Sequence, residues 1–284
     1  GSVRARNPLS IRRVRRALAA LLRRGRLDAA VCHSAWAQAI FGPVVRAAGV
    51  PLVFYLHGDV QGRHWTERWA RFTRPDLVVA NSRYTAGTLP NLYPGARSEL
   101  VAYPVEPADT AALRRERDAV RAELGAGPGE VVIVQSCRLE PWKGHRLHLE
   151  ALGRLRDLPG WTCWQVGGVQ RESEAAYLRE LQAQAERLGI ADRVRWVGQR
   201  RDVPRILAAA EVHCQPNLGP EPFGIAYVEA LYAGLPVVST EMGGAAEIVD
   251  ASCGILTPPG DADALAGALR RLVADAALRA RLGA

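Results

Sequence analysis

Short apolar runs alternate along the chain with segments in which apolar residues recur at helical spacing. From residue 27 onward these runs have the length of buried strands, and polar or charged residues separate them. Continuous apolar strands that are each followed by a helix are typical of parallel sheets covered by helices on both faces. The first half predicts strands at 29–33, 52–57, 77–80 and 99–102, with helices over 36–48, 66–72 and 82–89.

The second half repeats this alternation more completely. A charged helix is predicted over 110–124, and the glycine-containing stretch 125–130 separates it from the next strand. Further strands are predicted at 131–135, 162–166, 195–197, 212–215, 237–240 and 254–256. The pattern therefore predicts an α/β protein with two Rossmann-like, doubly wound domains. Their expected bounds are 1–106 and 129–284, with a linker region over 107–128.

One segment of the second half carries two carboxylates around the start of a helix. Pro222 cannot continue a helix from upstream, and Gly224 permits a tight turn before the apolar helical pattern that Gly234 ends. Glu221 precedes this helix and Glu229 lies on it. A helix that begins at glycine presents free N–H groups to an anion, and carboxylates accept hydrogen bonds from sugar hydroxyls. The alternative is a capping residue and a solvent-facing glutamate.

Two further motifs lie at the carboxyl ends of predicted strands, where open α/β sheets bind ligands. Residues 138–144 read Arg-Leu-Glu-Pro-Trp-Lys-Gly, and residues 243–249 read Gly-Gly-Ala-Ala-Glu-Ile-Val. With the segment from Glu221, they resemble the motifs of the retaining glycosyltransferases of family 4, which have the two-domain GT-B fold. The resemblance runs from about residue 27 to the end of the chain, and it is specific only through the combination of motifs.

The resemblance implies a role for each motif residue in binding a nucleotide-sugar donor. Arg138 and Lys143 match the cations at the donor diphosphate, and Gly144 opens the helix behind them. Glu221 matches the glutamate at the donor sugar, and Glu229 matches the one at the ribose. The remaining donor-binding positions that it implies, partly by position alone, are Phe223, Gly224, Ile225, Gly167 and Val194.

The chemistry of sugar transfer explains why cations are expected in this motif. Negative charge grows on the leaving diphosphate, so Arg138 could bind two oxygens as a fork while Lys143 contacts another as a point charge. The alternative is a surface arginine and lysine near a turn. The resemblance implies no cofactor, no metal, and no protein base or covalent nucleophile, because the leaving phosphate assists the acceptor.

In the first half, His57 lies at the carboxyl end of a predicted strand. A histidine at such a strand end faces the ligand cleft, and the family has one beside the donor sugar. A structural histidine is the alternative. Ser82 is interpreted as the cap of the next helix. Asp261 and Asp263 have a metal-ligand spacing, but their place at a helix start favours capping. The six histidines form no convincing metal site.

Composition and length are those of an ordinary reduced globular protein. The 284 residues suffice for two domains, and no membrane span or secretory signal is evident. Five scattered cysteines, odd in number, are typical of buried thiols rather than a disulfide framework. We therefore expect a cytoplasmic location.

The net charge of +8 is concentrated at the start, where nine arginines fall within residues 1–26 and no acidic residue precedes Asp28. Residues 10–24 predict a basic amphipathic helix. We interpret it as an ordinary surface helix; the alternative is peripheral contact with an anionic inner membrane face. Nucleic acid is not expected as a partner, because no nucleic-acid module is recognisable.

The resemblance also implies elements that are not in this sequence. Family members open with a strand, a glycine-rich turn, a helix and a strand, so about two βα units, on the order of 60 residues, are expected before Ser10. Family members also carry helices beyond the position of Ala284. The first domain is therefore predicted to be incomplete.

The predicted function is a retaining transfer of sugar from a UDP- or GDP-sugar to a hydroxyl acceptor, such as a glycan, a lipid-linked glycan or a small molecule. The first domain would lie on the acceptor side, and the second would bind the donor. Two alternatives remain: a truncated nucleotide-sugar-binding module without turnover, and a nucleotide-sugar epimerase of similar fold.

Overall fold

The computed structural model describes residues 8–25 and 27–284. The chain divides into two compact units, 1–103 and 104–284, which are considered separately below. The segment 107–128, predicted as a linker region, lies in the second unit. There α5 (Thr110–Arg114) and α6 (Arg117–Glu123) pack against α9 (Val203–Ala208).

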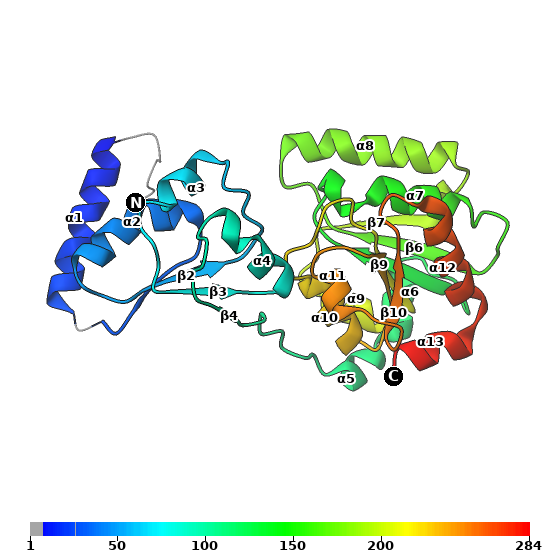
Figure 1. The fold of residues 1–284 in the computed structure, drawn as a ribbon. Helices are drawn as coiled ribbons and strands as arrows, with labels where there is room; N and C mark the ends of the chain where they lie inside the picture. The colour runs from blue at the N-terminus through cyan, green and yellow to red at the C-terminus, as the bar shows by residue number, and fades with distance from the viewer. Residues whose placement is uncertain (1–7, 26) are drawn as a thin grey trace. The chain divides into compact units, whose positions relative to one another are not determined.

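In the first unit, the described residues form a four-stranded parallel sheet in the order β1-β2-β3-β4 (Figure 1). Its core is built from apolar residues that alternate along the strands, such as Leu52, Phe54 and Leu56. The strands are β1 (Ala30–Cys32), β2 (Leu52–Leu56), β3 (Leu77–Ala80) and β4 (Ser98–Leu100). The helices are α1 (Pro8–Arg24), α2 (Ala35–Ala47), α3 (Trp65–Ala70) and α4 (Arg83–Thr88), followed by a 3-10 turn over Leu89–Asn91.

The second unit contains a six-stranded parallel sheet, within the described residues, in the order β10-β9-β8-β5-β6-β7. Its strands are β5 (Val131–Ser136), β6 (Trp161–Val166), β7 (Val194–Gly198), β8 (Val212–Gln215), β9 (Val237–Thr240) and β10 (Gly254–Thr257). The remaining helices are α7 (His145–Gly153), α8 (Glu172–Arg187), α10 (Ile225–Tyr232), α11 (Ala245–Ile248), α12 (Ala262–Ala274) and α13 (Ala276–Leu282). Single 3-10 turns occur at Pro141–Lys143 and Ala191–Arg193.

Two apolar cores cover the two faces of this sheet. On one face, residues of α7, α8 and α12 pack around Trp161 and Cys163 of β6. On the other face, residues of α6, α9, α10 and α11 pack around Trp164. The central strands are buried on both faces, which is why they read as uninterrupted apolar runs. The predicted α/β class with two parallel sheets is confirmed.

Some element boundaries differ from the prediction. The charged helix expected over 110–124 is two helices, because two different anchors hold its halves. The hydroxyl of Thr110 donates to the carbonyl of Tyr232, at 3.0 Å, whereas the buried Arg121 donates to Glu211. The fourth strand is Ser98–Leu100 rather than 99–102. Ser82 and Asp261 cap the helices that follow them, as predicted.

The basic helix at the start is present as α1, and its last buried residue is Leu22. Arg4, Arg6 and Arg26 of the arginine-rich run, and the opening Gly-Ser, lie outside the described residues. No helix in the described ranges is both long enough and apolar enough to cross a bilayer.

Three histidines of the second unit are buried, and each lies beside a polar partner. His148 Nδ1 lies 2.8 Å from Gln135 Oε1, His213 Nε2 lies 3.3 Å from Ser136 Oγ, and His145 Nε2 lies 3.4 Å from Cys137 Sγ. Burial lowers the pKa of His148 and of His213 to about 3, and that of His145 to about 4.

These depressed pKa values predict a loss of stability in acid. The unfolded chain binds protons at these imidazoles below an ordinary value of 6.5, while the folded chain keeps them neutral. The stabilisation that these neutral histidines contribute should therefore be complete above pH 6.5. The free energy of unfolding should fall as the pH is lowered toward 4. Urea unfolding between pH 7 and pH 5 measures this slope.

The variant His213→Gln removes one of these protons from the unfolded chain. It should lower the slope by up to about 1.4 kcal/mol per pH unit, since one proton fewer is taken up on unfolding. A slope equal to that of the unaltered protein would contradict the assignment.

Candidate active site

The order of strands in the second unit has a switch point between β5 and β8. From β5 the chain proceeds to β6 and β7 on one side, and from β8 it proceeds to β9 and β10 on the other. At such a point the loops leave the sheet in opposite directions and open a crevice outside the carboxyl ends of the strands. The loop after β5 carries Lys143, and the loop after β8 carries Glu221.

Lys143 and Glu221 meet at this switch point. The Lys143 ammonium donates to Glu221 Oε2, and the two side chains are only 10% and 14% exposed. The amides of Asn217 and Gln215 donate to the same oxygen, at 3.0 Å and 3.4 Å. The other oxygen, Oε1, has no hydrogen-bond partner among the described residues. One side of this buried carboxylate is therefore fixed, and the other can accept a hydrogen bond.

Buried glutamine side chains tie the loops to the ends of the central strands. Gln135 ends the apolar run of β5, and its amide donates to the carbonyl oxygen of Lys143, at 2.9 Å. Gln215 ends β8 and reaches Glu221. These hydrogen bonds fix the positions of Lys143 and Glu221 relative to the sheet.

Gly144 brings the loop after β5 close to the loop after β8. Its φ is +75°, and a Cβ at this position would collide with the carbonyl oxygen of Pro216. The residue begins α7 directly behind Lys143. Only glycine combines this conformation with this close approach.

The turn before α10 lies against the loop that follows β9. The backbone N–H of Gly244 donates to the carbonyl oxygen of Glu221, at 2.6 Å. Gly224 caps α10 in a left-handed conformation, and its missing side chain leaves room for the ring of Tyr227. Phe223 is half-buried, and Ile225 is exposed at the first position of the helix. The structure thus brings together the motifs from Glu221 and Gly243.

Glu229 lies on α10, away from this ion pair. It lines a small cavity of about 40 Å³ together with Thr110, Leu207 and Tyr232. Burial raises the pKa of its carboxyl group. Within the described part of the chain, that carboxylate has no hydrogen-bond or ion-pair partner. A half-buried carboxylate without a partner is typical of a group that binds a ligand.

Two further residues that were predicted to bind the donor, Arg138 and Gly167, follow the neighbouring strands β5 and β6. Arg138 follows β5, its side chain is 58% exposed, and its guanidinium lies 3.1 Å from Glu140 Oε1. Gly167 follows β6, and a Cβ there would collide with the carbonyl oxygen of Cys137. Both residues are at the carboxyl edge of the sheet.

Val194, which was also expected to contribute to donor binding, is the exception, because the structure does not place it at this edge. It is the first residue of β7, only 3% exposed, and belongs to the apolar core. Because the strands are parallel, the start of β7 lies at the edge opposite the crevice. The residues at the carboxyl end of β7 are Gly198 and those that follow it.

In the first unit, four residues gather at the carboxyl ends of the parallel strands. His57 follows β2; its Nε2 lies 2.8 Å from Nδ1 of His33, and its Nδ1 contacts the hydroxyl of Tyr103. The amide of Asn81 donates to the carbonyl oxygen of His57, at 3.2 Å. Burial, with a smaller effect of His33, lowers the pKa of His57. Its surroundings therefore favour the neutral form of the imidazole.

Sequence reasoning missed several members of these two clusters. His33 is the last residue of a predicted strand, so the position that singled out His57 could also have found it. Tyr103 and Asn217 come two or three residues after β4 and β8, where no motif marks them. Their roles became visible only through contacts with residues distant in sequence.

Comparison with protein families gives this geometry a context. The model described as "Glycosyl transferases group 1" matches residues 116–284, which is more than half of the chain. The chain belongs to the glycosyl transferases group 1 family. A second model, "Glycosyltransferase Family 4", matches residues 2–108, so this glycosyltransferase carries both family signatures in order.

Curated relatives of this glycosyltransferase include enzymes named for inositol-containing acceptors. A GDP-mannose-dependent alpha-(1-6)-phosphatidylinositol monomannoside mannosyltransferase of Mycolicibacterium smegmatis is 31% identical over 86% of this chain and 67% of the relative. A D-inositol 3-phosphate glycosyltransferase of Jonesia denitrificans is 32% identical over 73% of this chain and 51% of the relative. The chain thus spans about half to two thirds of the length of these two relatives.

Solved structures show the same two-domain GT-B fold. HepE of Anabaena, in complex with UDP-glucose, is 27% identical with a TM-score of 0.82, over 98% of this chain and 77% of that one. A glycosyltransferase of Rickettsia africae has a TM-score of 0.86 at 18% identity, over 100% of this chain and 76% of that one, and supports the fold alone.

The buried pair predicts strong coupling between two substitutions. Lys143→Met alone leaves the Glu221 carboxylate buried without its cation, and Glu221→Gln alone strands the ammonium, so each should cost about 3–5 kcal/mol in stability. The double variant should cost clearly less than the sum. Chemical denaturation of all four proteins measures the coupling, and strictly additive losses would rule it out.

The turn at Gly144 predicts a second result, for which Gly129 provides a matched control. Gly144→Ala should destabilise the second unit more than Gly129→Ala, although both glycines have a φ of +75°. The control position has open space around its missing Cβ, so alanine there bears only the conformational cost of about 1–2 kcal/mol. Thermal unfolding compares the two. Equal losses would show that contact with Pro216 is unimportant.

Proposed function

We propose that this glycosyltransferase moves a sugar from a nucleoside-diphosphate sugar to a hydroxyl acceptor, with retention of the anomeric configuration. The observation that carries the proposal is the buried pair of Lys143 and Glu221 at the switch point of the donor-side sheet. The pair presents a cation, and a carboxylate oxygen without a partner in the described part of the chain, where open α/β sheets bind nucleotides.

The charges at this edge suit the leaving group. As the sugar departs, negative charge accumulates on the diphosphate, and fixed cations stabilise the transition state. Lys143 is held in place by its partners, whereas the exposed Arg138 can turn toward a phosphate as a bidentate donor. Glu221 Oε1 would accept a hydrogen bond from a hydroxyl of the donor sugar. The α10 turn at Phe223, Gly224 and Ile225 would supply backbone N–H groups.

Glu229 is assigned to the ribose of the nucleotide. Its carboxylate is half-buried and unpartnered within the described residues, and two ribose hydroxyls would satisfy it. In the first unit, His57 would donate to or accept from a sugar hydroxyl. A neutral imidazole can do either, and His33 and Tyr103 hold this one in place.

The proposal includes no protein base, no covalent nucleophile and no metal. The leaving phosphate would take the proton of the acceptor hydroxyl, on the face of the sugar where the bond breaks. Arg138 and Lys143 would supply the positive charge that a metal ion supplies in other transferases.

The names of similar proteins narrow the donor and the acceptor. One relative is named as GDP-mannose-dependent, HepE was solved in complex with UDP-glucose, and the names of both curated relatives contain an inositol phosphate or a phosphatidylinositol. We therefore include a hydroxyl of an inositol phosphate, free or lipid-linked, in the proposed acceptor class. A cytoplasmic location, with peripheral contact of α1 at an anionic membrane face, also belongs to the proposal. The five cysteines are free thiols, which agrees with a location in a reducing compartment.

A panel experiment separates this function from its two alternatives. The protein is incubated with radiolabelled UDP- and GDP-sugars and with inositol phosphate acceptors, and the anomeric configuration of the product is read by NMR. Transfer with retention supports the proposal. An isomerised donor indicates an epimerase, and binding without turnover indicates a binding module.

Two substitutions should separate donor binding from turnover. Glu229→Ala should weaken nucleotide-sugar binding, because the ribose loses its acceptor, whereas Lys143→Ala should mainly reduce turnover. The exposed Glu186→Ala on α8 is the control and should change neither. Calorimetry with UDP and GDP, together with initial rates on folded protein, provides the readout. Unchanged affinity and rate in both variants would refute these site assignments.

A further inference from the structure

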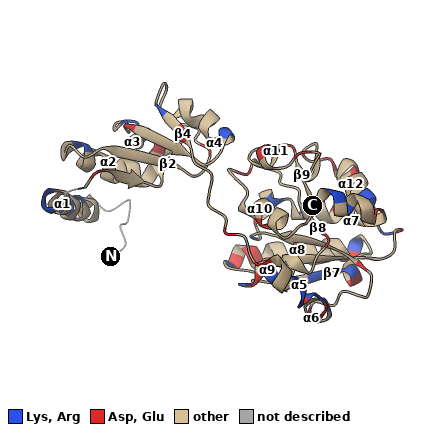
Figure 2. Cartoon of the chain, turned by 90° about the horizontal axis from the view of Figure 1, so that it is seen from below, with Lys and Arg blue, Asp and Glu red and all other residues tan. Residues whose placement is uncertain are grey.

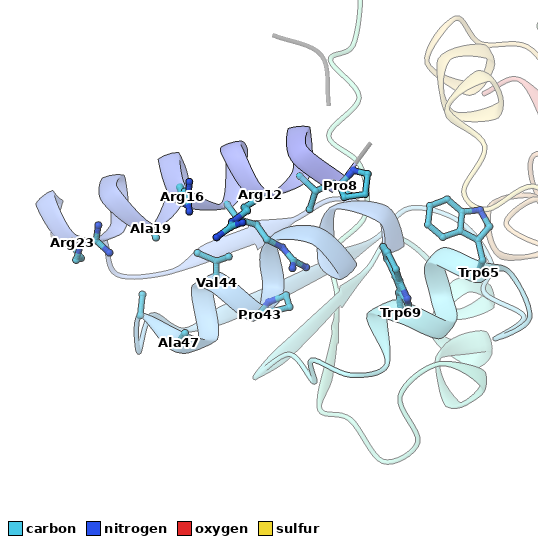
Figure 3. Close-up of a pocket in the computed structure, with 13 residues that line it drawn as sticks. Pro8, Arg12, Arg16, Ala19, Arg23, Pro43, Val44, Ala47, Trp65 and Trp69 are labelled. Atoms are coloured by element: carbon cyan, nitrogen blue, oxygen red, sulfur yellow. The ribbon is translucent and has the colours of Figure 1, made fainter. Parts of the chain in front are cut away.

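A groove of about 1100 Å³ lies between α1, α2 and α3 in the first unit (Figure 3). Its walls differ in chemistry. Pro43, Val44 and Ala47 of α2 form an apolar floor, and Trp65 and Trp69 of α3 stand at one end. The groove is far larger than the small cavity at Glu229, and none of its residues belongs to the candidate active site.

The aromatic end of the groove is unusually exposed. Trp65 and Trp69 are 42% and 47% exposed, and the neighbouring Phe72 is more exposed still. Two smaller hollows continue the apolar surface from Trp69 to Phe72. A contiguous exposed surface of this kind marks an interaction site, because leaving it in water is unfavourable.

Arginines of α1 form the opposite wall. Arg12, Arg16 and Arg23 line the groove, are exposed, and have no hydrogen-bond or ion-pair partner within the described ranges. Arg15 differs, since its guanidinium donates to the carbonyl oxygens of Ile40 and Ala39, at 2.7 Å and 3.0 Å. No acidic residue lies on α1 or among the described residues that line the groove, as the charge distribution in Figure 2 illustrates for the helix.

The leucines of α1 that pack into the core are not available to a bilayer. Leu22 is buried in the core of the first unit, and Leu18 packs against the same core. Insertion of this helix by its own apolar face would therefore require the unit to come apart. Apolar contact with a lipid can come from the groove and its tryptophans, and from Leu9 and Leu21, which are the exposed leucines of α1. The arginines of α1 add charge beside this surface.

We propose that this groove binds an anionic phospholipid of a bilayer surface. An acyl chain would lie along the α2 floor, and the phosphate would lie at Arg12, Arg16 and Arg23. Guanidinium groups bind phosphate oxygens as forks, and tryptophan suits the boundary between headgroups and acyl chains. The inference specifies the membrane contact that belongs to the proposed function, and the biological purpose of lipid binding rests on that function. Lipid binding itself can be measured without sugar transfer.

The first test compares vesicles of phosphatidylglycerol mixed with phosphatidylcholine against vesicles of phosphatidylcholine alone. The protein should cosediment with the anionic vesicles only, and less so at high salt. The triple variant R12Q/R16Q/R23Q should bind about 100-fold more weakly, at about fivefold per arginine. Equal binding to both kinds of vesicle, or none to either, would overturn the proposal.

A charge-matched control separates a groove from diffuse attraction. The variant R13Q/R24Q/R97Q removes the same net charge from residues that do not line the groove. It should retain most of the binding. If both triple variants lose binding equally, attraction is by net charge alone and the groove is not the site. Circular dichroism checks that each variant is folded.

The second test places the acyl chain and needs no arginine variant. Vesicles with brominated acyl chains should quench tryptophan fluorescence in the unaltered protein. Most of this quenching should disappear in W65F/W69F, because the other tryptophans lie elsewhere. Quenching that is absent, or that persists fully in that variant, overturns the proposal. The proposal is also overturned if inorganic phosphate occupies the groove and prevents vesicle binding, while the acyl chains make no contact with the tryptophans.

Binding of UDP or GDP, measured on the same samples, keeps the two proposals apart. Nucleotide binding without binding to anionic vesicles contradicts the groove proposal alone. Vesicle binding without nucleotide binding or transfer contradicts the proposed function alone.

Discussion

The ion pair between Lys143 and Glu221 is the contact around which the donor-side edge of the second unit is arranged. It joins the loops of the two strands at which the sheet changes direction. Because both groups are buried, neither is stable there without the other. The close turn at Gly144 follows from bringing these loops together. The hydrogen bond from Gly244, in the loop after β9, holds the backbone of Glu221 from another side.

A polar layer within the sheet supports this pair. Gln135, Gln165 and Gln215 lie near the ends of β5, β6 and β8 and are almost fully buried. Gln135 and Gln165 contact His148, while Gln215 contacts Glu221. Buried amides need partners, so each fixes the position of the group that it bonds. The same burial keeps the histidines of this layer neutral, which links the rigidity of the site to pH.

Much of the fold and part of the site could be predicted from local sequence patterns. The strands of the second unit read clearly because burial on both faces makes them continuously apolar. The motif residues Lys143 and Glu221 were recognisable by their places after strands. Val194 was expected at the donor edge but lies at the start of β7, because an apolar strand residue looks the same at either end of the strand. The break between α5 and α6 was also hidden, since each helix is held by a different distant partner.

The sequence by itself determined the class of fold, the order of its elements and the chemical identity of the donor-side motifs, since these depend on periodicity and on residues near one another in the chain. Only the tertiary structure decided which charges meet, that one oxygen of Glu221 is left unpaired among the described residues, and that His33 and Tyr103 hold His57. It also decided that α1 turns its apolar side inward and its arginines toward a groove. These are contacts between residues far apart in sequence, so packing sets them and no local pattern encodes them.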